Sequence, residues 1–204
     1  MKKTSFSCQR DGLTIRGYVF GKPEIGRSAV IISHGFLANQ RTVRQYAVTL
    51  AKEGYLAITY DFNGGGIGSK SDGRSVDMTL MTERSDLLEV VKAVQTQFHP
   101  ASISLMGCSQ GGFVSALAAK EIQNSICRLI LFYPALCIPD DARKGRMMFY
   151  RFDPKNVPNI LGRFPMKLGG DYARIVMDMN PFEEISGYKG PTLLVHGTAD
   201  DLDT

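Results

Sequence analysis

The sequence contains no tryptophan, only three histidines and four cysteines, and no apolar run long enough to cross a membrane. The cysteines form no C-x-x-C pair, and with so few histidines beside them the pattern argues against a zinc site. We expect reduced, mostly buried thiols. The first residues are positively charged but are not followed by an apolar run, so they do not predict a secretory signal, and a cytoplasmic location is expected.

Long runs of one charge are also absent. The 24 Lys and Arg residues and the 20 Asp and Glu residues are spread along the chain, for a net charge of +4. This argues against nucleic-acid binding, which needs a clustered basic surface. Of the 204 residues, 44% are apolar, enough for one large core that needs no disulfide or metal. A single domain over residues 1–204 is therefore expected.

Two kinds of apolar pattern alternate along the chain. Apolar residues recur at helical spacing between Val43 and Leu50 and between Leu87 and Phe98, and a third, almost wholly apolar helix follows Ser109. Strands alternating with helices predict an α/β fold with a mainly parallel sheet. The short, β-branched runs predicted as buried strands are Leu13–Phe20, Ser28–Ser33, Leu56–Tyr60, Ser102–Met106, Arg128–Tyr133 and Thr192–Val195.

The segment 134–191 interrupts this alternation. It holds most of the prolines and more than half of the methionines, and it lies between two predicted core strands. We expect an insertion that folds over the strand ends. Two interpretations remain open, a cap whose adaptable methionine surface shapes the substrate site and a surface excursion with its own small core.

The pentapeptide Gly107-Cys108-Ser109-Gln110-Gly111 fits the pattern G-x-S-x-G and stands between a predicted strand and a predicted helix. In that position the flanking glycines permit a tight turn, and the backbone N–H after the serine points at a reacting carbonyl oxygen near the positive end of a helix. The alternative is a serine in an ordinary strand-to-helix turn. The context favours Ser109 as a nucleophile.

Four ordered landmarks make the chain resemble the α/β-hydrolases, and within them the bacterial cinnamoyl and feruloyl esterases and related carboxylesterases. The landmarks are SHGF at Ser33–Phe36, DFNGGGIGSKSDG at Asp61–Gly73, GCSQGG at Gly107–Gly112 and HGTADD at His196–Asp201. The resemblance covers nearly the whole chain. It implies a three-layer α/β-hydrolase sandwich with a mainly parallel sheet and residues 134–191 as a cap insertion.

The resemblance also implies roles for individual residues. Ser109 is the nucleophile, the backbone N–H groups of Phe36 and Gln110 form the oxyanion hole, and Asp200 orients the catalytic histidine. Because the family order is Ser, Asp, His, the base is expected after Asp200 and is not among the 204 residues; the last core strand and helix of the family are expected to be missing with it. An incomplete and inactive hydrolase is therefore one expectation.

None of the three histidines present is expected to be the base. By resemblance His34 is structural and packs beneath the oxyanion loop, and His196 is structural at a strand end. His99, next to Pro100, is expected to be a surface or helix-capping residue. No imidazole among them is expected both to reach the serine hydroxyl and to be held by the acid.

The implied reaction is ester cleavage through an acyl-enzyme, on small aromatic (cinnamoyl or feruloyl) or short-chain esters. No metal or organic cofactor, nucleic acid or membrane is implied, and the expected partner is a small-molecule ester. Asp140 or Asp141 could accept a hydrogen bond from a phenolic hydroxyl, although an Asp after Pro139 is equally expected as a helix N-cap. Alternatives are a thioesterase or peptidase, and a truncated binding protein without catalysis.

The glycine-rich stretch NGGGIGSK raises the possibility of phosphate binding. When Lys70 and Ser71 are aligned with a P-loop, the second required glycine falls on Ser69. A dinucleotide fingerprint fits only with a wrong residue, and the next helix begins too late, near Met78. Both patterns fail, and the resemblance implies a flexible loop beside the mouth of the active site.

Overall fold

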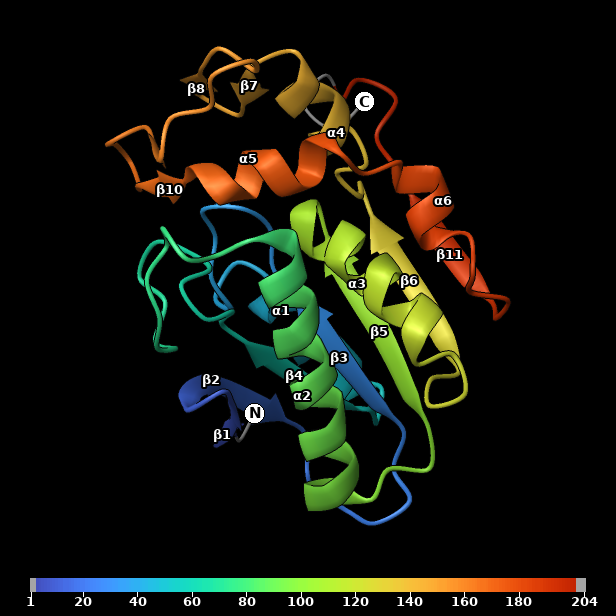
Figure 1. Cartoon of the computed structure of the whole chain (residues 1–204). Helices are drawn as coiled ribbons and strands as arrows, with labels where there is room; N and C mark the ends of the chain where they lie inside the picture. The colour runs from blue at the N-terminus through green and yellow to red at the C-terminus, as the bar shows by residue number, and fades with distance from the viewer. Residues whose placement is uncertain (1–2, 201–204) are drawn as a thin grey trace.

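A seven-stranded sheet forms the centre of the computed structural model, which describes residues 3–200 (Figure 1). The strand order is β1-β2-β4-β3-β5-β6-β11, and the five strands from β4 to β11 in this order are parallel. The predicted α/β fold with a mainly parallel sheet is confirmed. The strands are β1 (Lys3–Arg10), β2 (Leu13–Phe20), β3 (Ala29–Ser33), β4 (Leu56–Tyr60), β5 (Ile103–Cys108), β6 (Arg128–Phe132) and β11 (Thr192–Val195).

The first strand was not predicted. β1 pairs antiparallel with β2 through a turn at Asp11 and Gly12, whose φ angles are 49° and 79°. Two successive residues with positive φ are typical of the hairpin turns that Asp-Gly favours. Only Phe6 of β1 is buried, because this strand is at the edge of the sheet, so its composition lacks the apolar character of the central strands.

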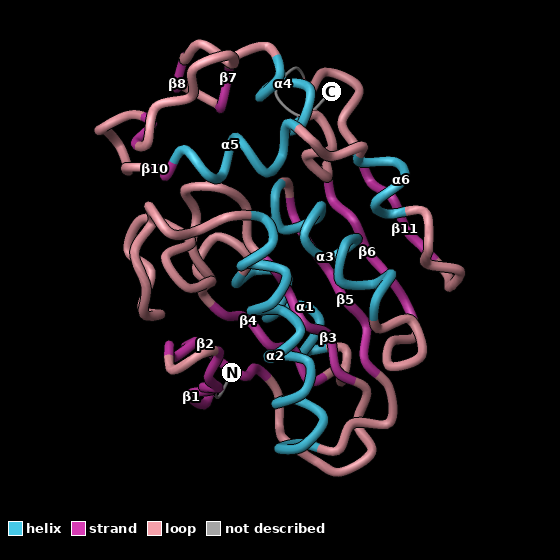
Figure 2. The backbone as a smooth tube through the Cα atoms, in the orientation of Figure 1, coloured by secondary structure: helices cyan, strands magenta, loops and turns pink. Residues whose placement is uncertain are grey.

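Helices cover both faces of the sheet and produce the three layers (Figure 2). Along β3, Val30 and Ile32 pack with α1 (Arg44–Lys52), whereas Ala29 and Ile31 belong to the larger core formed with α2 (Leu80–Phe98) and α3 (Gln110–Glu121). Successive side chains of a strand point to opposite faces, so a strand covered on both sides is apolar throughout. This is why the central strands were recognisable as continuous apolar runs.

The long helix α2 has well-defined ends. Thr79 and Thr82 exchange side-chain to backbone hydrogen bonds of 2.8 and 3.1 Å, which satisfy two N–H groups at its start. His99 ends the helix in the left-handed conformation, with φ 46°, just before Pro100. The predicted stop before Pro100 is confirmed, and His99 is an exposed capping residue.

Residues between β6 and β11 fold above the carboxyl ends of the parallel strands (Figure 1). Their buried side chains, among them Leu168, Tyr172 and Val176, belong to the same core as the sheet and α2. The segment therefore has no separate core of its own. Its elements are α4 (Ile138–Arg143), β7 (Arg146–Met147), β8 (Tyr150–Arg151), β9 (Ile160–Leu161), β10 (Leu168–Gly169), α5 (Gly170–Met177) and α6 (Pro181–Ile185).

The outer strand β11 is exposed along its whole length. Leu193 and Leu194 are 54% and 60% exposed, although both are apolar. Thr192–Val195 was predicted as a buried strand, but in the described residues it is an exposed edge of the sheet. None of the helices within residues 3–200 combines the length and apolar character needed to span a bilayer.

Candidate active site

Ser109 occupies a sharp turn between β5 and α3. Its φ and ψ are 52° and −123°, a conformation that L-residues rarely adopt. The flanking glycines make the turn possible: a Cβ on Gly107 would lie 2.2 Å from the carbonyl oxygen of Gly111, and a Cβ on Gly111 would lie 2.3 Å from that of His34. Ser109 N–H donates to Phe132 at 3.0 Å, which fixes the turn to β6. The serine is therefore held in a strained position by its neighbours.

Ser109→Gly should stabilise the fold. A non-glycine residue in such a conformation costs about 1–3 kcal/mol, and glycine removes that strain while losing about 0.5–1 kcal/mol to greater freedom of the unfolded chain. We expect the free energy of unfolding in urea to rise by about 1 kcal/mol for Ser109→Gly. Ser109→Ala keeps the β-carbon and is the matched control. Equal stability of the two variants would show that the turn is not strained.

Phe36 and Gln110, whose backbone N–H groups are the predicted oxyanion-hole donors, line the same cavity as Ser109. Phe36 lies in the loop after β3, and Gln110 is the first residue of α3. The loop is close to the serine, because a Cβ on Gly35 would lie 3.2 Å from the Cβ of Ser109. Within residues 3–200 neither N–H donates to a protein acceptor. Both remain able to bind negative charge that develops on a carbonyl oxygen.

His34 is buried directly after β3, and both nitrogens of its ring are engaged within the protein, so the ring is not placed to act as the base. Its Nδ1 lies 2.9 Å from the carbonyl oxygen of Gly35, and its Nε2 accepts the N–H of Phe62 at 3.3 Å. Nε2 therefore carries no proton, and burial lowers the pKa of the imidazole. The ring also packs edge-on against Phe62, with centroids 5.0 Å apart. With both nitrogens engaged, His34 is a neutral support for the loop that carries Phe36.

Asp200 lies beyond the end of β11, and the structure places one histidine beside it. His196 Nε2 is 3.6 Å from Asp200 Oδ2, both side chains being 29% or less exposed. The sequence-based expectation was a structural His196 and an acid that orients a different imidazole. Within the described residues no histidine lines the cavity in front of Ser109. Asp201, the last residue of the HGTADD landmark, lies outside the described residues.

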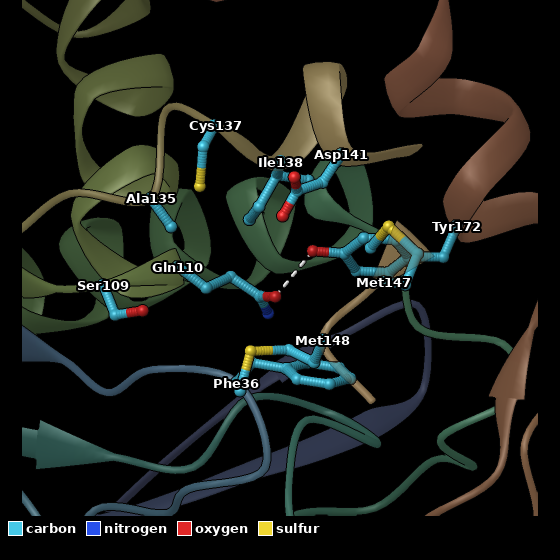
Figure 3. Close-up of a pocket in the computed structure, with 10 residues that line it drawn as sticks. All are labelled: Phe36, Ser109, Gln110, Ala135, Cys137, Ile138, Asp141, Met147, Met148 and Tyr172. Carbon is cyan, nitrogen blue, oxygen red and sulfur yellow. Dashed lines mark hydrogen bonds between the residues drawn. The ribbon is translucent and has the colours of Figure 1, made fainter. Parts of the chain in front are cut away.

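A cavity opens in front of Ser109, between the strand ends and the insertion (Figure 3). It encloses about 380 Å³ of space not filled by protein atoms, which includes space open to solvent at the mouth. Most of its wall is apolar and comes from the insertion. The lining residues are Phe36, Ser109, Gln110, Ala135, Cys137, Ile138, Asp141, Met147, Met148 and Tyr172.

The two candidate aspartates of α4 differ in position. Asp141 lines the cavity, is 16% exposed and accepts a hydrogen bond of 3.1 Å from Arg146 Nε. Asp140 is not among the lining residues; it is 63% exposed and pairs with Arg143 at 2.6 Å. The alternative prediction that one of them caps the helix is wrong, because the N-cap is Cys137 and α4 has already begun at Ile138.

The glycine-rich stretch supports the loop after β3. A Cβ on Gly66 would lie 1.6 Å from the carbonyl oxygen of Ala38, so only glycine allows this close approach. Asn39 Nδ2 donates to Ile67 at 2.8 Å, and the Asp61 carboxylate accepts the N–H of Lys70 at 2.8 Å. Hydrogen bonds hold the stretch in place, where a flexible loop at the active-site mouth was expected, and none of its residues lines the cavity.

A buried polar chain beside the cavity was not predicted. Gln110 Nε2 donates to Glu83 Oε2, and Tyr172 Oη donates to Gln110 Oε1, each at 2.6 Å. Figure 3 shows the bond between Tyr172 and Gln110 at the cavity wall. A signal was present in the sequence, because Glu83 falls at helical spacing between Leu80 and Leu87 on the buried face of α2.

Comparison with known proteins agrees with this geometry. A family model described as serine aminopeptidase, S33, matches residues 25–168. A structure of Est1E from Butyrivibrio proteoclasticus with bound ferulic acid superposes with a TM-score of 0.88 and 31% identity, over 97% of this chain and 80% of that one. Monoglyceride lipase of Rattus norvegicus is 29% identical over 140 residues, which are 67% of this chain and 45% of the lipase. The chain thus matches less than half of the length of that lipase. A thioesterase domain from the curacin biosynthetic pathway, 18% identical with a TM-score of 0.68, shares the fold.

Proposed function

The chain belongs to the serine aminopeptidase S33 family of α/β-hydrolases, and we propose that it hydrolyses carboxylic esters through an acyl-enzyme formed on Ser109. The observation that carries this proposal is the serine held at φ 52° at the cavity wall, flanked by two N–H groups without protein acceptors among the described residues. This is the arrangement that acyl transfer needs.

In the proposed reaction, Ser109 Oγ attacks the ester carbonyl carbon while a base takes the hydroxyl proton. The N–H groups of Phe36 and Gln110 stabilise the negative charge on the carbonyl oxygen. The tetrahedral intermediate collapses, the C–O bond to the alcohol breaks, and the base returns its proton to the leaving alcohol. A water molecule then attacks the acyl-enzyme in the same way, releasing the acid and restoring the serine.

The base is the part of this mechanism that residues 3–200 do not place beside Ser109. Both ring nitrogens of His34 are engaged, and His99 caps the far end of α2. The proposal assigns the proton transfer to a histidine outside the 204 residues, held by Asp200 as the resemblance implies. A test therefore compares the 204-residue chain with any longer form that its gene encodes.

The substrate proposal is an ester of a small aromatic acid. Est1E, the similar esterase, was solved with ferulic acid bound. In the present chain the cavity wall is apolar where Ile138, Met147 and Met148 contribute, which suits an aromatic ring. Asp141 provides a carboxylate on that wall, across the cavity from Ser109 (Figure 3). A phenolic hydroxyl can donate to it.

Asp141→Ala should weaken binding of phenolic acids. A hydrogen bond to a charged group contributes about 1.5–3 kcal/mol, so we expect the Kd for ferulate and the KM for methyl ferulate to rise about 10- to 100-fold. The kinetics on an acetyl ester, which has no phenol, should change little. Calorimetric titration measures the Kd for ferulate even in a form of the protein that does not hydrolyse esters.

Asp140→Ala is the matched control, because Asp140 precedes Asp141 on α4 and also pairs with an arginine but does not line the cavity. We expect wild-type affinity from it. Equal losses for the two variants, or equal losses on ferulate and acetyl esters, would remove Asp141 from the substrate site.

A second candidate function is ligand binding without catalysis. It is favoured by one observation, that within the described residues no imidazole lines the cavity beside Ser109. A panel of methyl ferulate, an acetyl ester, an acyl thioester and an aminoacyl anilide separates the possibilities. Turnover of the thioester or anilide alone would indicate a thioesterase or a peptidase. Ferulate binding without turnover in the full-length gene product would indicate the binding protein.

A further inference from the structure

A buried hydrogen-bonded chain connects three separate parts of the fold at the candidate active site. Glu83 comes from the first turn of α2, Gln110 follows the nucleophile at the start of α3, and Tyr172 comes from α5 in the insertion. Their side chains are linked by two bonds of 2.6 Å. None of the three residues is more than 2% exposed.

Glu83 is an unusual residue for its position. Neighbouring positions on the same buried face of α2 are Leu80 and Leu87, and a carboxyl group is costly to bury. Its Oε1 has no hydrogen-bond partner within the described residues. Burial, reinforced by the nearby negative charge of Asp86, raises the pKa of Glu83 well above its usual range. A buried carboxyl group at this place is not explained by packing alone.

The neighbouring Asp86 is accounted for differently. It accepts hydrogen bonds from Arg10 Nε at 2.5 Å and from the backbone N–H of Asn63 at 2.8 Å. These contacts tie α2 to β1 and to the loop after β4, away from the nucleophile. The two acidic residues lie one turn apart on one helix, but only Glu83 is bonded to a residue that lines the cavity.

Gln110 is the central residue of this hydrogen-bonded chain. Its side-chain amide is bonded at both ends, so the residue cannot rotate without breaking one of the two bonds. The same residue carries one of the two N–H groups proposed for the oxyanion hole. The ring of Tyr172 also packs against the ring of Phe36, with centroids 6.2 Å apart, and Phe36 carries the other N–H group. The hydrogen-bonded chain therefore contacts or includes both residues whose N–H groups are proposed for the oxyanion hole.

We propose that Glu83 is a positioning residue of the active site. Through Gln110 it fixes the direction of the Gln110 N–H, and through Tyr172 it holds the insertion and the Phe36 loop against the nucleophile. The inference rests on the proposed function, because it assumes that these N–H groups stabilise an oxyanion. Such donors act only when they are held in place before the reaction begins.

The test compares Glu83→Leu with Glu83→Gln in a form of the protein that carries its base. Leucine removes the acceptor for Gln110, whereas glutamine keeps an acceptor of the same shape without charge. We expect Glu83→Leu to lower kcat on an acetyl ester about 10- to 100-fold, somewhat less than the loss of one whole oxyanion donor, with KM changed less than threefold. Glu83→Gln should keep kcat within threefold.

A second readout does not require turnover. A fluorophosphonate reacts once with an activated serine and uses the same oxyanion hole, so its rate of reaction with Ser109 should follow the same order among the variants. Asp86→Asn is the matched control for a polar change at a buried position of the same helix, and we expect it to react at the wild-type rate. Thermal unfolding of each variant establishes that the compared chains are folded.

The possible outcomes separate the two proposals. Wild-type rates in Glu83→Leu, an equal loss in Glu83→Gln, or an equal loss in Asp86→Asn would overturn the positioning role. If Glu83→Leu does not fold, Tyr172→Phe, which removes only the second bond, should still lower the rate of phosphonylation three- to tenfold, and a wild-type rate there would also overturn it. Failure of Ser109 to be phosphonylated in the wild-type form that carries its base would instead reject the proposed function.

Discussion

Ser109→Ala is expected to abolish ester hydrolysis without disturbing the fold. Within the described residues Ser109 Oγ makes no hydrogen bond, so its removal costs the folded state little. The reaction, in contrast, loses its nucleophile. For a form that carries its base we expect kcat to fall about 10⁴- to 10⁶-fold, to the residual rate that binding and the oxyanion hole can support. Hydrolysis of an acetyl ester and of methyl ferulate measures this loss.

The control for this variant is Ser85→Ala, which removes a hydroxyl that bonds only to the backbone of α2. It should hydrolyse both esters at the wild-type rate. Persistence of the full rate in Ser109→Ala would exclude this serine as the nucleophile. Fast turnover by the 204-residue chain, lost in Ser109→Ala, would contradict the assignment of the base to a histidine outside it, and would direct attention to His196 beside Asp200.

Gly111→Ala is expected to be strongly destabilising. An added Cβ would lie 2.3 Å from the carbonyl oxygen of His34 and 2.6 Å from that of Ser33. Both are backbone atoms at the end of β3, so relief requires the sheet and α3 to separate. We expect a loss of about 3 kcal/mol or more in the free energy of unfolding, a large part of the stability of an ordinary domain. Urea unfolding monitored by circular dichroism measures it.

Gly197→Ala is the comparison for stability, because among the described residues the nearest atom to its added Cβ is 3.9 Å away and its φ is ordinary. Its effect should be within about 0.5 kcal/mol of wild type. Similar stability of the two alanine variants would mean that the contact between the turn at Ser109 and the end of β3 can relax. Packing would then not require a glycine at position 111.

The central strands could be predicted because each is buried on both faces. The predicted Leu56–Tyr60 is the observed β4, and every residue of it is buried. Where one face or edge meets solvent, the signal weakens. The edge strand β1 was missed although Asp11 and Gly12 mark its turn. α2 begins at Leu80, close to the start predicted near Met78, although its first turn buries polar residues such as Glu83 among the apolar ones.

In the candidate site, some residues could be predicted from a local sequence pattern and others could not. Ser109 and the N–H of Gln110 follow from a local turn, so the pentapeptide identifies them. Contacts between distant positions leave no such pattern: Gln110 lies 27 residues from Glu83 and 62 from Tyr172 in sequence. Asp140 and Asp141 are successive residues of α4, and successive residues of a helix point in different directions. Which of the two faces the cavity therefore depends on where the helix begins, at Ile138, and the sequence alone does not give that start.

The open edge at β11 is the outer edge of the sheet formed by the described residues. Leu193 and Leu194 are exposed there, and an exposed apolar edge strand is a template for pairing with another strand. His196 and Asp200 follow directly on the same strand. Any strand that pairs with this edge would therefore lie next to the candidate acid.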